Sequence, residues 1–285
     1  MSPTGKIFVI ADPTDDRQIA LERAIQLGVD TKSALHVFCC TYLDEEALGE
    51  FASRRDGKHH EMERVEAWLD QQLAPYSKEG LTIEREIWWN EKWAESACHA
   101  AARCGASLIV KSSFSHSKLG RIARKTSDLT LLRNSSCPVL LAKSSEPWIN
   151  KCVLATVALD QVDEEHERLN NIITTEARRL ADMTGFELHV LAAHQEHPDI
   201  ALVLNMLCDD EGVSRQAYAA QRFGIPEEQM HLIQGNARLV IIDKAYELKA
   251  DVVVIGSSAR KGIKAALIGN TAEKVLDELN IDLLV

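Results

Sequence analysis

A glycine-containing stretch near the end of the sequence has the residue types that hold phosphate groups. Val252–Leu276 (VVVIGSSARKGIKAALIGNTAEKVL) passes from apolar residues through glycine, serine and basic residues into a helix-like tail. In α/β proteins, a strand that breaks at a glycine and leads into a helix presents backbone N–H groups to an anion. The stretch therefore predicts either a phosphate site or a loop that keeps only the shape of one.

The nucleotide hypothesis names a specific set of residues in this stretch. Glycines let the backbone approach phosphates closely, and side-chain hydroxyls and amides supply further donors. The candidate phosphate-binding residues are Gly256, Ser257, Ser258, Gly262, Gly269, Asn270 and Thr271. On this interpretation the second half holds ATP. On the alternative interpretation, the loop shape serves the strand-to-helix turn and no cofactor binds.

The sequence predicts neither a catalytic residue nor a metal site. Gly256–Arg260 (GSSAR) ends in arginine, so it departs from the G-x-S-x-G motif of a nucleophilic serine. The seven cysteines have no CxxC spacing, and the ten histidines do not form a set of three convergent ligands. We therefore expect a protein that is not an enzyme.

Composition and charge exclude several classes of protein. The 285 residues are 46% hydrophobic and 26% charged, which is ordinary for a globular protein of one large or two medium domains. A formal charge of −11 argues against a nucleic-acid partner. No apolar run reaches the length of a membrane span, and the N-terminus lacks the features of a signal peptide. We expect a cytoplasmic protein without a membrane span.

The chain contains an internal repeat. The corresponding pairs of segments are Lys6–Pro13 with Lys151–Ala158, Ser33–Cys40 with Phe186–Ala193, Ala106–Ser113 with Ala250–Ser257, and Ser135–Leu141 with Leu279–Val285. A polar linker with a proline, Ser144–Asn150, separates the copies and predicts domains 1–146 and 147–285. The second copy stops at the counterpart of Leu141, so we expect its last strand to be cut short and part of a C-terminal tail to be missing.

Strand-like and helix-like patterns alternate within each copy. Short apolar, β-branched runs without polar alternation are typical of strands buried on both faces of a parallel sheet. Leu169, Ile173, Ala177 and Leu180 form one helical stripe, and Gly185 follows where a helix-ending glycine is expected. The pattern predicts two tandem doubly wound α/β domains of Rossmann-like type, with a longer first helix in the second copy.

Two segments are apolar enough to form a pocket or an interface. Pro198–Cys208 is apolar nearly all round, and the helical stretch Glu45–Tyr76 is its counterpart in the first half. Packing between the halves, a hydrophobic ligand enclosed between them, and self-association into a homo-oligomer remain open. The candidate residues for this pocket or interface are Leu48, Phe51, Trp68, Ile200, Leu204 and Leu207.

The combined features resemble the universal stress protein family in its tandem form. The resemblance covers essentially the whole chain and rests mainly on Lys6–Pro13 (KIFVIADP), Ser135–Lys143 (SSCPVLLAK) and Ile268–Val285 (IGNTAEKVLDELNIDLLV). It implies a five-stranded parallel sheet in each half, similar to adenine nucleotide alpha hydrolases. It also implies an intramolecular pseudo-dimer whose last strands meet antiparallel, and a role in survival under stress.

The nucleotide-binding branch of this family carries a glycine motif after the fourth strand, and both halves depart from it. The motif is glycine, two residues, glycine, nine residues, glycine, then serine or threonine. In the second half, Gly256 and Gly269 match the first and third glycines, but Ala259 replaces the second and Asn270 replaces the hydroxyl residue. Thr271, the next residue, is a partial substitute.

The first half lacks all three glycines but keeps a second family landmark. The motif positions are occupied by Ser112, Ser115, Lys125 and Thr126. The acidic residue at the end of the first strand is Asp12 in the first half and is replaced by Ala158 in the second. We therefore expect a non-enzymatic stress-response protein that acts by binding an unknown protein or small molecule. The alternatives are an ATP-binding switch in the second half and a carrier of a hydrophobic ligand.

Overall fold

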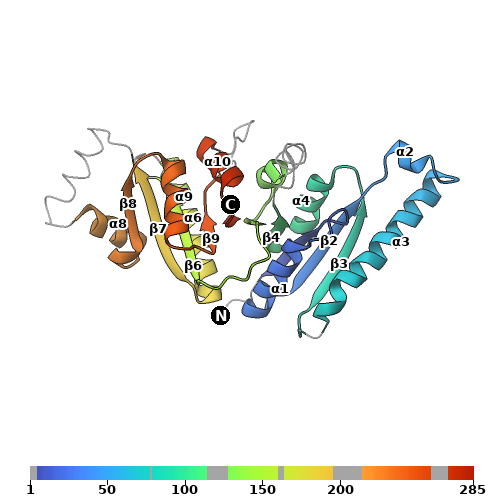
Figure 1. The fold of residues 1–285 in the computed structure, drawn as a ribbon, viewed down its shortest axis with the longest axis horizontal. Coiled ribbons are helices and arrows are strands. Elements are labelled where there is room, and N and C mark those ends of the chain that lie inside the picture. Colours follow the sequence, from blue (N-terminus) through green and yellow to red (C-terminus); the bar gives the residue numbers. More distant parts are fainter. Residues whose placement is uncertain (1–4, 78, 114–127, 160–163, 195–213, 258–268) are drawn as a thin grey trace. The chain divides into compact units, whose positions relative to one another are not determined.

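The computed structural model describes residues 5–77, 79–113, 128–159, 164–194, 214–257 and 269–285. The chain divides into two compact units, Met1–Pro147 and Trp148–Val285. Figure 1 shows the strands and helices of both units. Each unit is an α/β domain, which confirms the predicted fold class, whereas the pairing of the two units stays a prediction.

The first unit has the predicted five-stranded parallel sheet. Its strands are β1 (Lys6–Ala11), β2 (Leu35–Thr41), β3 (Ile83–Trp89), β4 (Ala106–Ser112) and β5 (Val139–Ala142), in the spatial order β3-β2-β1-β4-β5. Its helices are α1 (Ile19–Thr31), α2 (Glu45–Leu48), α3 (Arg54–Leu73) and α4 (Trp93–Arg103), with a short 3₁₀ turn at Ala74–Tyr76. The strand order reverses between β1 and β4, and ligands of such sheets bind outside the carboxyl ends at this point.

The second unit repeats this arrangement. Its strands are β6 (Cys152–Val157), β7 (Glu187–His194), β8 (Met230–Gln234), β9 (Val252–Val254) and β10 (Asp282–Leu284), in the order β10-β9-β6-β7-β8. Its helices are α6 (Glu164–Thr184), α8 (Arg215–Phe223), α9 (Ala237–Glu247) and α10 (Asn270–Glu278), with a 3₁₀ turn at Glu227–Gln229. With 21 residues, α6 is longer than the 13-residue α1, as predicted.

The strand registers show which residues of the two units correspond. Val9 lies opposite Val110 of β4 in the first sheet, and Ala155 lies opposite Val254 of β9 in the second. Val110 and Val254 are counterparts in the repeat, so Val9 corresponds to Ala155. The structural correspondence is thus shifted by one residue from the sequence alignment of these strands. With this shift, Asp12 of the first unit corresponds to Ala158 of the second.

The core of each unit follows from the apolar strands. The central strands β1 and β6 are buried along almost their whole length, and Phe8 and Val153 are completely buried. Gly185 ends α6 with a φ of +71°, a conformation that glycine adopts without the steric cost of a Cβ atom. Within the described ranges, no helix combines the length and the apolar composition that a membrane crossing requires.

A pair of histidines packs on the edge of the second sheet. His189 of β7 stacks on His231 of β8, and their Nδ1 and Nε2 atoms are 3.0 Å apart. Lys244 of α9 lies near His231 and is paired with Glu247 at 2.8 Å. Burial, Lys244 and His189 lower the pKa of His231 to about 4, against the opposing charge of Glu247. The fold therefore requires a neutral His231.

This histidine makes stability depend on pH. The pKa of His231 is near 6.5 in the unfolded chain and about 4 in the folded protein. Its neutral form therefore gives the full free energy of unfolding above pH 6.5, and this free energy decreases as the pH falls toward 4. Because the ring is only half-buried, we expect a loss of about 1–2 kcal/mol. Urea unfolding at several pH values should show a shallower pH dependence for His231→Gln. The exposed His59→Gln should keep the wild-type profile, and an unchanged profile for His231→Gln would contradict this assignment.

Candidate functional site

Each unit has a cavity at the carboxyl ends of its central strands. The cavity of the first unit has a volume of about 560 Å³ and that of the second about 530 Å³. Both lie where the strand order reverses, which is the usual ligand position in doubly wound sheets. Both volumes are within the range of small-molecule sites.

The second cavity contains the described part of the predicted phosphate loop. Gly256, Gly269 and Thr271 line it, whereas Ser257 is buried, with 4% of its surface exposed. Asn270 is the first residue of α10. Ser258 and Gly262 lie outside the described residues. The fold thus brings the two ends of the loop together at one cavity.

Gly256 allows a helix to pack closely against the strand end. A Cβ atom at this position would lie 2.8 Å from Ile173 Cδ1 and 2.9 Å from Leu169 Cδ1, both on α6. These distances are too short for nonbonded carbon atoms. The absence of a side chain at Gly256 therefore has a reason within the protein itself, independent of any phosphate.

Gly269 has a different environment. No described atom lies within 4 Å of the position that its Cβ would take, and its φ of −57° suits any residue. It precedes α10, whose first N–H groups have no partners within the helix and attract negative charge. Packing by the described residues thus does not require a glycine here, and the N-terminus of α10 is accessible from the cavity.

A buried amide side chain holds the end of the first strand in both units. In the second unit, Asn170 accepts a hydrogen bond from Ala158 N at 3.0 Å and donates one to Ala158 O at 2.6 Å. In the first unit, Gln18 accepts from Asp12 N at 3.2 Å and donates to Asp12 O at 2.8 Å. Corresponding strand ends therefore have their backbone groups satisfied by the protein.

The two cavities differ in chemistry. Apolar side chains dominate the second, with a few polar groups from Thr156, His166, Asn170 and Thr271. The first is lined by several charged residues, namely Asp12, Asp15, Arg17, Glu61, Arg64 and Lys111. The sequence predicted no phosphate site in the first half, because all three motif glycines are missing there.

A buried ion pair and a helix cap replace the glycine loop in the first unit. Ser112 stands at the first motif position, and its hydroxyl accepts a hydrogen bond from Ala20 N, at the start of α1, at 2.9 Å. Lys111 Nζ lies 2.6 Å from Asp128 Oδ1, and Ser113 donates to the other carboxylate oxygen at 2.6 Å. In the repeat, Ile255 and Ala272 correspond to Lys111 and Asp128. The first unit therefore has an ion pair where the second has an apolar pair.

A second charged pair comes from α3. The buried stripe of this helix is Gly57, Glu61, Val65 and Leu69, so a carboxylate occupies a core position. Glu61 accepts two hydrogen bonds from Arg64, at 2.7 and 2.8 Å, and one from the Thr41 hydroxyl. Burial raises the pKa of Glu61, but these hydrogen bonds outweigh it and the net shift is downward. The four-residue spacing of these positions could have identified Glu61 as a buried residue. Its charge separates it from the apolar pattern by which buried helix positions are predicted.

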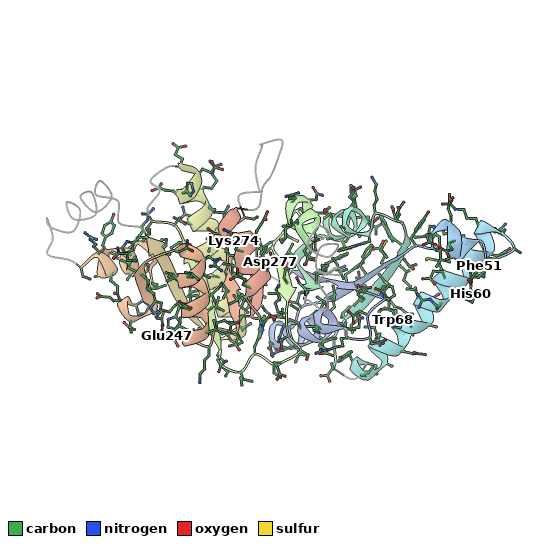
Figure 2. All side chains as sticks on the ribbon, turned by 45° about the horizontal axis from the view of Figure 1, so that its top comes forward. Phe51, His60, Trp68, Glu247, Lys274 and Asp277 are labelled. Carbon is green, nitrogen blue, oxygen red and sulfur yellow. The ribbon has the colours of Figure 1, made fainter. Side chains whose placement is uncertain are left out.

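The apolar candidate residues occupy different places. Leu48 and Phe51 pack over Gly57, where a Cβ would lie 2.8 Å from Leu48 Cδ2. Figure 2 shows Phe51 beside His60 near one end of α3, with Trp68 farther along the helix, and the rings of Phe51 and His60 are 5.3 Å apart. Ile200, Leu204 and Leu207 lie outside the described residues. A hydrophobic ligand between the halves stays a prediction.

The described residues hold neither a reactive thiol nor a metal cluster. Burial and nearby charges, Asp12 first among them, raise the pKa of Cys39 to about 12, and burial and Asp251 raise that of Cys152 to about 12. Such thiols stay protonated and are poor nucleophiles. In the part of the chain that the structure describes, no three histidine, cysteine or acidic residues are grouped to hold a metal ion.

Comparisons with known proteins agree with the geometry. The model of the universal stress protein family matches residues 3–143 and 156–285. Universal stress protein E of Escherichia coli K12 is 31% identical over 304 positions, which cover 100% of this chain and 94% of that protein. A universal stress protein structure from Pseudomonas aeruginosa UCBPP-PA14 has a TM-score of 0.75 at 29% identity, covering 98% of this chain and 92% of that one. One from Archaeoglobus fulgidus, with a TM-score of 0.66 at 16% identity, shares the fold.

The two glycines of the second cavity should respond differently to an added side chain. Gly256→Ala forces Leu169 and Ile173 of α6 to move and should cost about 1–3 kcal/mol of unfolding free energy. Gly269→Ser meets no described atom and supplies a favourable helix cap, so it should change stability by less than about 0.5 kcal/mol. Urea denaturation of both variants measures this difference. Equal losses would refute the packing role of Gly256.

The buried ion pair of the first unit can be tested against its apolar counterpart. Lys111→Ile leaves Asp128 buried without its cation and should cost about 3–5 kcal/mol. Lys111→Ile with Asp128→Ala recreates the pair found in the second unit and should recover most of that loss. Denaturant unfolding of the single and double variants measures the recovery. A double variant that is less stable than the single one would contradict the correspondence between the two units.

Proposed function

Because the chain belongs to the universal stress protein family, we propose that it acts in the stress response by binding and not by catalysis. The main support is that Glu61 and Lys111, the candidate acid–base groups of the first cavity, engage other groups of the protein. Glu61 is hydrogen-bonded to Arg64, and Lys111 is paired with Asp128. A general base or nucleophile would need its reactive atom directed at a substrate.

We further propose that the protein works in the cytoplasm. Cys39, Cys98 and Cys152 are buried free thiols in the described part of the chain. Free thiols suit a reducing compartment, where structural disulfides are rare. Fractionation of cells into cytoplasm, membrane and exported protein tests this directly, and recovery of the protein in the exported fraction would overturn it.

Nucleotide binding in the second half is the ligand hypothesis that the geometry supports. No described atom lies near the Cβ position of Gly269, beside the N-terminus of α10, and a helix N-terminus attracts phosphate. Two observations argue against nucleotide binding. Side chains of α6 lie close to Gly256, and the Asn170 amide already hydrogen-bonds both backbone groups of Ala158. We therefore propose that ATP, if it binds, contacts the protein mainly through its phosphates at α10.

Calorimetric titration of the protein with ATP and magnesium tests this proposal. Asp and Asn are equally good helix caps of nearly equal size, but only Asp repels phosphate. Gly269→Asp should therefore bind ATP at least about tenfold more weakly than Gly269→Asn, a difference of about 1.4 kcal/mol. Equal affinities of the two variants would show that the phosphates do not bind at α10. If the wild-type protein shows no binding at millimolar ATP, the nucleotide hypothesis is wrong, and binding of another ligand or a partner protein remains.

A further inference from the structure

We propose that the cavity of the first half binds a small organic anion, a carboxylate or a phosphate monoester, anchored by the guanidinium of Arg64. This site is separate from the second-half ATP hypothesis. It also uses a residue outside the glycine motif. Figure 1 shows α3, which carries Arg64, running alongside β2 and β3.

The guanidinium of Arg64 is held in a fixed orientation. Its Nε donates to Glu61 Oε2 at 2.7 Å, and its Nη2 donates to Glu61 Oε1 at 2.8 Å. The Glu61 side chain is only 8% exposed and also accepts a hydrogen bond from Thr41, so it is a rigid support. A carboxylate thus holds one edge of the planar group in place before any ligand arrives.

The rest of the guanidinium is available to a ligand. The Arg64 side chain is 46% exposed and lines the cavity. Among the residues that the structure describes, none accepts a hydrogen bond from its Nη1. A planar guanidinium with free N–H groups matches the oxygens of a carboxylate or a phosphate. Preorganisation by Glu61 lowers the entropy lost when an anion binds.

The other charges of the cavity are compatible with an anion. Arg17 also lines the cavity, and its side chain donates a long hydrogen bond of 3.3 Å to Ser145 Oγ. Asp12 Oδ1 accepts hydrogen bonds from the backbone and hydroxyl of Thr14, and Asp15 Oδ1 accepts one from Arg17 N. These two carboxylates thus engage groups of their own loop.

The size and lining of the cavity indicate an organic ligand. A volume of about 560 Å³ is far more than an inorganic ion needs. Ile10, Ala11 and Leu43 provide apolar surface, and Tyr42 and Trp93 provide aromatic surface. Ligand sites typically combine such surface with a few polar anchors. We infer that the anionic group meets Arg64 while an apolar body covers the strand ends.

Nuclear magnetic resonance of the full chain with ¹⁵N-labelled arginine tests the proposal. The probes are inorganic phosphate and succinate, titrated at constant ionic strength with sodium chloride as the control. The Nε–H signal of Arg64, identified by its absence in Arg64→Lys, should shift saturably with at least one probe and not with chloride. A response to phosphate alone identifies a phosphate ester as the ligand class, and a response to succinate alone identifies a carboxylate.

Two further variants separate binding from folding. Arg64→Gln combined with Glu61→Gln removes both charges and leaves no unpaired buried carboxylate, so it should fold and lose the anion response, followed through the Arg17 signal. Glu61→Gln alone keeps the Arg64 cation but removes the carboxylate that fixes its orientation. This variant should bind the probes about three- to tenfold more weakly, a difference of about 1 kcal/mol. Arg55→Gln, at an exposed position of the same helix that does not line the cavity, should bind the probes as the wild type does. A response no different from chloride, or one that the double variant retains, would overturn the proposal.

Discussion

The hydrogen bonds of one amide side chain to the end of the first strand determine the geometry of each half. Backbone groups at a strand end lose their sheet partners, and a buried group without a partner is costly. Gln18 satisfies both backbone groups of Asp12, and Asn170 satisfies both of Ala158. These bonds also tie the following helix to the sheet, because Gln18 immediately precedes α1 and Asn170 lies within α6. They thereby set where each cavity opens.

From this common frame the two halves diverged in the chemistry of the strand ends. The first half has the buried Lys111–Asp128 pair, and it has the exposed Arg64 paired with the buried Glu61. The second half has Ile255 and Ala272 at the positions of the former pair, and Gly256 in close contact with α6. One fold therefore presents a charged cavity and a mostly apolar one. Two such cavities in a single chain suit different ligands better than two copies of the same ligand.

Much of the fold could be predicted because buried parallel strands and amphipathic helices leave local patterns. The apolar run at Val252–Val254 is a strand, and the stripe from Ile173 to Leu180 is the buried face of α6. The charged cavity could not be predicted, because Arg64 and Lys111 are far apart in sequence and each is ordinary in its local context. The sequence correctly matched Asp12 with Ala158, but the alignment of the first strands was one residue out of register, because only strand pairing defines the register.

The sequence by itself determined the two α/β units, their parallel strands and the position of the glycine loop, since periodicity and glycine placement act over short distances. Only the tertiary structure decided what the loop residues do. A Cβ atom at Gly256 would clash with side chains of α6, whereas no described atom lies near the Cβ position of Gly269. The tertiary structure likewise brought Glu61 and Arg64 of α3 to the end of β2. A binding site depends on which side chains lie close together in space. Packing between α3 and β2, which are separate in the sequence, brings Glu61, Arg64 and Thr41 together.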